Sequence, residues 1–423
     1  FMSCPFTEIS LPDGLTSIGA SAFDGAKITS LKLPASLKTV DGFGNCTALT
    51  SLTIPEGVEA IASSAFSGCK GIAGELKLPS TLKTIEGIAF QNCSGLTGTV
   101  TLPAGMTSVP DRVFSGCSGI TKVVIPATVT VIERQALAGT GITSIDLPAG
   151  LTTIDSDAFK GCSGLTSVQI PVGVTSLGGF QNCANLETIN IPNTVATLAS
   201  NTFKGCTKLT TVSIPASVTK IGQYAFSGSG LKTVTIPATV KFGSSDSALF
   251  SNCLSLETVV IEDGATIIPS NTFSGCTALT SVTIPASVTS IGGQCFMNCS
   301  ALTSVRLPAG LTKLEYNVFW SSGLVSIDIP EGVATIGSSC FSDCASLASA
   351  TIPSTTTTIS NYAFSDAALT SVYVKAATPP VISKGTFSEV PKAIPVYVPT
   401  GSKTAYQGAN YWSDFTNIIE KDF

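Results

Sequence analysis

Residues 279–299 read LTSVTIPASVTSIGGQCFMNC. The first half alternates, with Val282 and Ile284 on either side of Thr283, which is typical of a short strand with one buried face. Pro285 follows directly, and because proline has no backbone N–H to donate, it ends the pairing of that strand with a neighbour. This half therefore predicts a short strand that points Val282 and Ile284 inward and Thr283 outward.

The second half of the stretch returns the chain to the same interior. Val288 and Ile291 are spaced to form a second short inward pair on the opposite side of the coil. Gly292 is expected at a turn that needs an unusual φ angle. Phe296 then fills the interior, and Cys299 begins the return to the next strand. Together the two halves predict one complete coil.

This unit recurs along most of the chain. A Leu-Pro or Ile-Pro dipeptide returns about every 23 residues, a period typical of solenoid repeats. A unit of this size cannot bury its apolar face alone, so neighbouring coils stack around a continuous core. We therefore predict that residues 1–375 form a solenoid of about 16 coils, and that residues 376–423 form a last atypical coil and a C-terminal cap. A short helix from Ser402 to Trp412, capped by Ser402, is expected in the cap.

The repeat carries a resemblance to a known family. Over roughly residues 7–375 it follows L-x-x-[VI]-x-[IL]-P-x-x-[VL]-x-x-I-x-x-x-[AC]-F-x-x-C, which resembles the BspA-type (Treponema-type) leucine-rich repeat family of bacterial surface proteins. The resemblance implies a leucine-rich repeat solenoid. Short parallel β-strands would line its concave side, a second short strand or turn would lie opposite, and there would be little helix. It also implies an exported protein with a role in adhesion, and it brings no shared catalytic motif.

Most cysteines occupy one position of the repeat. Eleven of the 14 follow a Phe by three residues: Cys46, Cys69, Cys93, Cys117, Cys162, Cys183, Cys206, Cys253, Cys276, Cys299 and Cys344. In these coils the next Leu or Ile comes one residue later than in the five coils that carry Ala26, Thr140, Ser229, Ser322 or Ala367 instead. We expect the longer turn to point a small side chain inward, and the shorter turn to have no room for one.

The cysteines are expected to be buried free thiols that pack as small hydrophobic groups. Equivalent positions in stacked coils have parallel Cα–Cβ vectors, which is the wrong geometry for a disulfide. Disulfides remain the alternative, because an exported chain is normally oxidised.

Composition excludes several kinds of site. The chain has no His, so it has no Ser-His-Asp triad and no His-ligated metal, and we expect no enzyme, no catalytic or metal residues and no cofactor. A net charge of −5 with 22 Lys and Arg argues against nucleic acid as a partner. No apolar run is long enough to span a membrane, and residues 1–6 lack the charged and apolar regions of a signal peptide.

The candidate binding surface is the outward strand position between the two inward residues of each coil. Half of this row is Ser, Thr or Val, and Tyr373 is its one aromatic residue. We predict a binding stripe along it at Lys32, Lys77, Asp146, Gln169, Asn190, Arg306, Asp328 and Tyr373. Such a row favours weak multivalent contact over one tight site. The alternative is that the threonines are there only because they suit a β-surface.

These observations, with the resemblance, indicate a secreted or cell-surface protein that acts by binding. We expect an adhesin-like, monomeric solenoid whose partners are host extracellular or matrix proteins, or other cell surfaces. The alternative is a structural spacer or scaffold that presents a domain outside this sequence.

Overall fold

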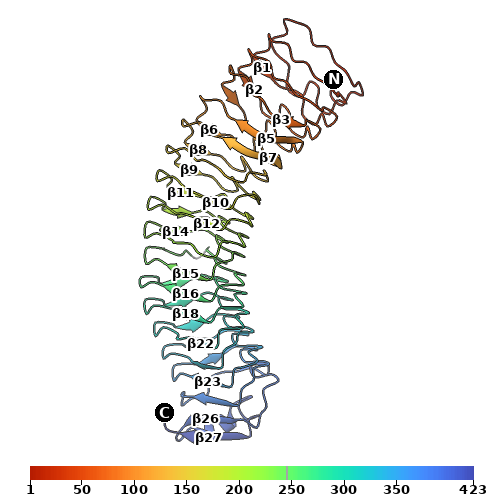
Figure 1. Ribbon diagram of the computed structural model, residues 1–423. Helices are drawn as coiled ribbons and strands as arrows, with labels where there is room; N and C mark the ends of the chain where they lie inside the picture. Colours follow the sequence, from red (N-terminus) through yellow and green to blue (C-terminus); the bar gives the residue numbers. More distant parts are fainter. Residues whose placement is uncertain (244–245) are drawn as a thin grey trace. The chain divides into compact units, whose positions relative to one another are not determined.

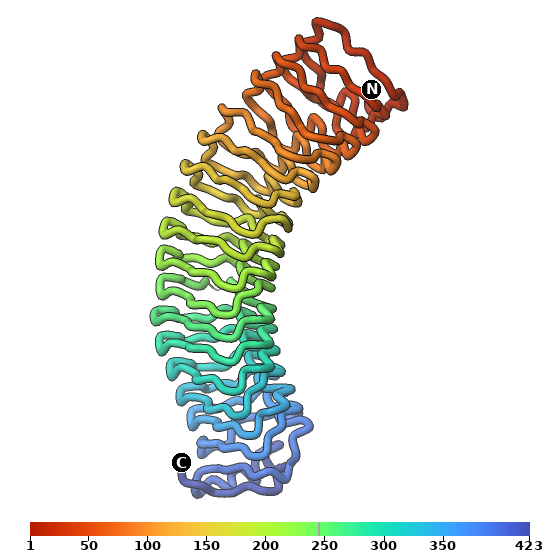
Figure 2. The backbone as a smooth tube through the Cα atoms, viewed as in Figure 1, coloured from red at the N-terminus to blue at the C-terminus, as the bar shows by residue number. Residues whose placement is uncertain are grey.

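A computed structural model describes residues 1–243 and 246–423. The chain forms two compact units, Phe1–Ser217 and Val218–Phe423, which we call the first and second units. Each is a stack of similar coils whose strands all pair in parallel (Figures 1 and 2). The predicted β-solenoid with very little helix is therefore confirmed.

Most coils of the first unit contribute to one or both of two strand rows. The first row, formed by the residues before the Leu-Pro or Ile-Pro dipeptide, contains β3 (Gly74–Glu75), β5 (Leu96–Thr101), β7 (Gly119–Val124), β10 (Ser167–Val168) and β12 (Thr188–Ile189). The second row contains β1 (Thr39–Val40), β2 (Ala60–Ile61), β4 (Thr84–Ile85), β6 (Ser108–Val109), β8 (Val131–Ile132), β9 (Thr153–Ile154), β11 (Ser176–Leu177) and β13 (Thr197–Leu198). In Figure 1, β3, β5 and β7 lie on the inner side of this unit's curve and β6, β8 and β9 on its outer side.

The second unit repeats the two rows. Its first row contains β15 (Thr233–Ile236), β16 (Thr258–Ile261), β18 (Ser281–Thr283), β21 (Ser326–Asp328), β23 (Ser349–Ile352), β25 (Ser371–Val374), β26 (Pro395–Pro399) and β27 (Asn417–Lys421). Its second row contains β14 (Lys220–Ile221), β17 (Ile267–Ile268), β19 (Ser290–Ile291), β20 (Lys313–Leu314), β22 (Thr335–Ile336) and β24 (Thr358–Ile359). Equivalent residues pair in register, as Val234 does with Val259 and Val259 with Val282.

A column of phenylalanine rings runs through the interior of each unit. In the second unit the rings from Phe226 to Phe387 lie face to face, with neighbouring centroids 5.1–5.8 Å apart. The first unit has the same column, interrupted once where Leu137 is fully buried in place of a ring. Offset stacking of this kind adds to the stabilisation that burial alone provides. One ring per coil therefore forms the centre of the core.

The turn after each Phe holds a buried side chain in every coil, contrary to our expectation for the shorter turns. The third residue after Phe is 0% exposed in the eleven Cys coils, and Ser229 and Ser322 at the same place are each 3% exposed. The residue before it takes a left-handed φ in both kinds of coil, as at Gly68 and Gly228. The backbone therefore directs this side chain inward before the point in the sequence at which the longer and the shorter turns differ.

In four neighbouring coils of the first unit, Asn and Gly alternate at this left-handed position. Asn45, Gly68, Asn92 and Gly116 succeed one another there, all with positive φ. A Cβ on Gly68 would lie 2.4 Å from Oδ1 of Asn45, and one on Gly116 would lie 2.4 Å from Oδ1 of Asn92. The amide of one coil therefore occupies the space that the glycine of the next coil leaves.

Gly292 has a different role from the one predicted. Its φ lies outside the left-handed region, but a Cβ there would lie 2.5 Å from the backbone N of Ser270 in the preceding coil. The close approach of two backbones, and not a special φ angle, requires glycine at this position.

A second left-handed position lies two residues before the core Phe in most coils, and Ile88 occupies it in one coil with φ 66°. A β-branched side chain is strained in this region, whereas asparagine tolerates it. Replacing Ile88 with asparagine, as at Asn201 and Asn271, is expected to raise the free energy of unfolding by about 1 kcal/mol. Thermal unfolding measures the gain, and Asn271→Ile is the matched reverse change. A melting temperature that falls in I88N and rises in N271I would contradict the strain argument.

The C-terminal residues cover the last ring of the second unit's column. Trp412 packs on Phe387 with centroids 5.5 Å apart and donates its Nε1–H to the carbonyl of Pro380 at 2.8 Å. Tyr406 is fully buried and donates its hydroxyl to the carbonyl of Ala376 at 2.7 Å. The expected helix is shorter than predicted: α1 spans Lys403–Gly408, and Ser402 makes no side-chain capping bond.

Candidate binding surface

The predicted stripe is exposed in the first unit but has no continuous chemistry there. Lys32, Lys77, Asp146, Gln169 and Asn190 are all exposed. The Asn190 amide is occupied, because it accepts from the Ile170 N–H at 2.7 Å and donates to the Ile170 carbonyl at 3.1 Å. This side chain extends the pairing between two coils, which gives it a structural use.

In the second unit the stripe residues converge. Arg306, Asp328 and Tyr373 line one hollow of about 820 Å³, together with Lys375 and Lys421. The register explains the convergence, because Asp328 pairs with Thr351, which pairs with Tyr373 on the next strand. Successive coils thus place a cation, an anion, a threonine and an aromatic ring, in that order, along this face of the second unit.

Two functional candidates at this hollow were missed by sequence reasoning. The Tyr373 ring stacks on Tyr397 with centroids 4.7 Å apart, and Lys421 Nζ lies 4.9 Å from the centroid of the first ring and 5.4 Å from that of the second. The row was expected to stop at Tyr373, its one aromatic residue, whereas β26 and β27 continue it. The signal was present in the sequence, since Val396-Tyr397-Val398 repeats Val372-Tyr373-Val374.

Two further hollows belong to the first unit. One, of about 600 Å³, lies beside Lys77 and the long strand β5, whose register with β7 shifts between Gly98 and Thr99. Gly98 pairs with Ile120 and Thr99 with Lys122, so the register skips Thr121 of β7.

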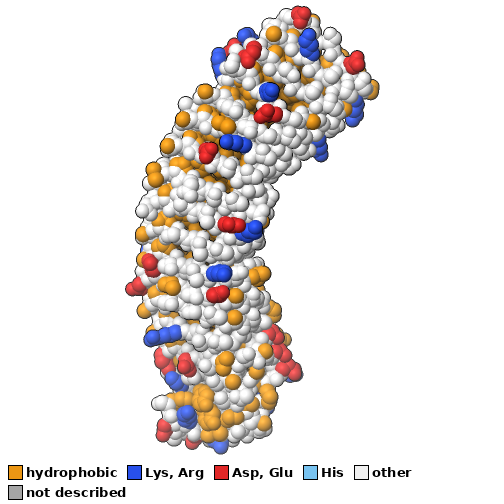
Figure 3. Space-filling model, in the orientation of Figure 1, with side chains coloured by type: hydrophobic (Ala, Val, Ile, Leu, Met, Phe, Trp, Pro, Cys, Tyr) orange, Lys and Arg blue, Asp and Glu red, His pale blue; other side chains and the backbone are white. Residues whose placement is uncertain are grey.

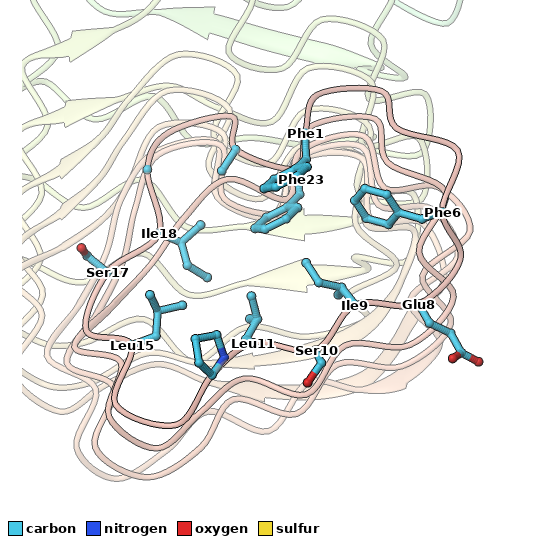
Figure 4. A pocket seen from close by; sticks show the side chains of 13 residues that line it. Phe1, Phe6, Glu8, Ile9, Ser10, Leu11, Leu15, Ser17, Ile18 and Phe23 are labelled. Atoms are coloured by element: carbon cyan, nitrogen blue, oxygen red, sulfur yellow. The ribbon is translucent and has the colours of Figure 1, made fainter.

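The other hollow, of about 670 Å³, lies over the first rings of the core column. Figure 4 shows Leu11, Leu15 and Ile18 across it from the stacked rings of Phe1 and Phe23. The centroids of these two rings lie 5.5 Å apart. Its lining is largely the apolar interior of the first coils, without a charged group pointing into it.

The cysteines are placed for packing. All 14 lie in the described residues as free thiols. Each of the eleven repeat cysteines donates its S–H to the carbonyl of the core residue in the preceding coil at 3.0–3.2 Å. Burial raises the pKa of Cys117 to about 12 and that of Cys162 to about 11, so these thiols stay protonated and unreactive at neutral pH. Residues 1–243 and 246–423 contain no group of three or more acidic or Cys side chains arranged to hold a metal.

Thiol labelling tests this arrangement. At neutral pH the folded chain is expected to react with iodoacetamide at Cys4 alone, because Cys4 is half-exposed and the other cysteines are buried. After denaturation without reductant, intact mass should show all 14 thiols modified. Prior reduction is the control and should not change this mass. Labels that appear only after reduction would establish disulfides instead.

The coil length, the proline after each first-row strand, the ring column and the cysteine that follows each ring are all features of one known family. The profile described as BspA type leucine-rich repeat region matches residues 1–97, 41–150, 132–257 and 243–370. The chain belongs to the BspA-type leucine-rich repeat family. No curated protein matches it significantly.

Among solved structures, a leucine-rich repeat protein from Bacteroides ovatus is 29% identical, with a TM-score of 0.61 over 75% of this chain and 82% of its own. A leucine rich cell surface protein from Faecalibacterium prausnitzii is 25% identical over 85% of this chain and 80% of its own, with a TM-score of 0.42. In the part of this BspA-type chain that the structure describes, no helix has the length and apolar character needed to cross a membrane.

Proposed function

We propose that this BspA-type chain is a non-catalytic interaction protein of the cell surface or extracellular space, with an adhesin-like role. The observation that carries the proposal is the first row of strands. In β15, for example, Val234 and Ile236 are buried whereas Thr235 between them is exposed. The row thus offers one outward side chain per coil, at a spacing of about 4.8 Å that pairing fixes.

The composition of this surface favours a partner that touches many coils. Figure 3 shows a face on which charged side chains are few and scattered, while hydrophobic side chains gather near the C-terminal end of the second unit. Single contacts with Thr and Ser are weak, and repetition along the row adds them together. We propose host matrix proteins or other cell surfaces as partners, a monomeric chain, and no cofactor. In this proposal residues 1–375 carry the contact surface and residues 376–423 close the stack.

The experiment is a binding screen of the purified chain against immobilised extracellular matrix proteins. Saturable binding to at least one of them at micromolar concentration is expected. A variant with Thr235, Thr283 and Thr351 changed to lysine should bind more weakly, because it places bulky charges along the row of the second unit. Thr→Lys changes at Thr130, Thr152 and Thr175, three exposed threonines away from the row, are the matched control. Absence of saturable binding to every matrix protein and cell surface would support the spacer role instead.

A further inference from the structure

Three charged residues of the hollow in the second unit lack partners within the protein. Some exposed charges of the first unit are paired between neighbouring coils, as Glu59 is with Lys38 at 3.2 Å and Lys83 at 2.6 Å. Among the described residues, no ion pair or hydrogen bond engages the side chains of Arg306, Asp328 or Lys375. These groups are therefore free to meet an external ligand.

Among the side chains that line the hollow, the balance of charge is positive. Arg306, Lys375 and Lys421 face two acids, and one of these, Glu331, already accepts hydrogen bonds from the backbone N–H and the hydroxyl of Ser354. Asp328 is the remaining free acid. The chain as a whole has a net charge of −5, so this local excess of cations departs from the character of the rest of the molecule.

The hollow also has the composition of a protein-binding hot spot. Arg and Tyr are among the residue types most enriched where binding energy concentrates, and here Arg306 lines the same hollow as Tyr373, whose ring stacks on Tyr397. The pair is rigid because the rings stack on each other and Lys421 lies over both. On β27, Ile419 extends the row beside Tyr397 and is 36% exposed. An apolar and aromatic patch beside free cations suits a protein segment that carries both carboxylates and apolar side chains.

We propose that the surface formed by Arg306, Asp328, Tyr373, Tyr397, Lys375 and Lys421 binds an acidic segment of a protein partner. Carboxylates of the segment meet the guanidinium of Arg306 and the ammonium groups of Lys375 and Lys421, and an apolar side chain of the segment packs on the tyrosine pair. Asp328 accepts one donor from the segment, such as a backbone N–H. This inference rests on the proposed binding function and names the chemistry of the partner.

The test uses the full chain and two fluorescein-labelled peptides. In the first peptide, glutamate alternates with leucine or serine. The second peptide has glutamine in place of every glutamate. Fluorescence anisotropy should show the glutamate peptide binding, with affinity that falls as salt is raised, and the glutamine peptide binding about tenfold more weakly or not at all. The double variant R306S/K421S should weaken binding of the glutamate peptide about tenfold.

The matched control is K32S/K77S, which removes two exposed cations from the same strand row in the first unit and changes the net charge equally. It should leave peptide affinity within about twofold of the unchanged chain. Equal binding of the two peptides, or equal loss in R306S/K421S and K32S/K77S, would overturn the proposal. Thermal unfolding of both variants confirms that these exposed changes leave the fold intact.

The matrix-protein screen separates this inference from the proposed function. If matrix binding persists in R306S/K421S and the glutamate peptide does not bind, the acidic-segment proposal is wrong and the general binding function stands. If the glutamate peptide binds selectively but no matrix protein or cell surface does, the adhesin-like role is wrong and the acidic-segment site stands.

Discussion

Replacing Phe273 with alanine is expected to lower the free energy of unfolding by about 3–5 kcal/mol. The ring is fully buried and is stacked on both sides, with centroid distances of 5.8 Å to Phe250 and 5.6 Å to Phe296. Truncation removes both contacts and leaves a void inside a column that neighbouring strands hold in register, so the coils cannot collapse to fill it. Chemical denaturation followed by circular dichroism measures the loss.

Two further variants make this prediction specific. Thr283→Ala, on the exposed face of β18, should change stability by less than about 0.5 kcal/mol. Phe273→Leu should cost less than F273A, because Leu137 is fully buried in the equivalent place of its own coil. A loss in F273A no larger than that in T283A would show that the ring column does not support the core.

Replacing Trp412 with alanine is expected to destabilise the C-terminal coils by about 3–5 kcal/mol. Trp412 is fully buried, covers Phe387 and bonds to the Pro380 carbonyl. Because each coil of a repeat protein is stabilised by its direct neighbours, the damage should be greatest near the site. Hydrogen exchange followed by mass spectrometry should show faster exchange in β26 and β27 than in the unchanged chain, with β15 and β16 unaffected.

Tyr411→Ala is the matched control for this cap, since the adjacent Tyr411 is 41% exposed. Its exchange pattern should match that of the unchanged chain. Uniformly faster exchange throughout the second unit in W412A would contradict a local role, and so would no change at all.

The repeat allowed most of the fold to be predicted, because side-chain direction in a strand and stacking between coils both follow directly from spacing. Even so, Val282 and Ile284, expected inward, are only half-buried. The errors arose where a neighbouring coil decides the outcome. Glycine is required at position 292 because the backbone of Ser270 in the preceding coil lies close to it. The Ser229 side chain is buried although its turn is the shorter one. Contacts between coils are absent from the pattern of a single coil.

The candidate site was less predictable for the same reason. Arg306, Asp328 and Tyr373 could be placed in one row, but their grouping with Lys421 depends on how the atypical C-terminal coil folds back beside β25 and β26. The structural use of Asn190 depends on the backbone of Ile170 in another coil. The sequence pattern gives the face on which a residue lies, whereas the partner of its polar group requires coordinates.

The alternation of Asn and Gly at the left-handed position of residues 45–116 constrains how such a chain can grow or shrink. Removing the coil that carries Gly68 would bring Asn45 against Asn92, and two amides would then compete for the space that one glycine leaves. Removing two adjacent coils restores the match. Between Asn45 and Gly116, deletion of two adjacent coils therefore preserves the alternation of Asn and Gly, whereas deletion of one coil does not.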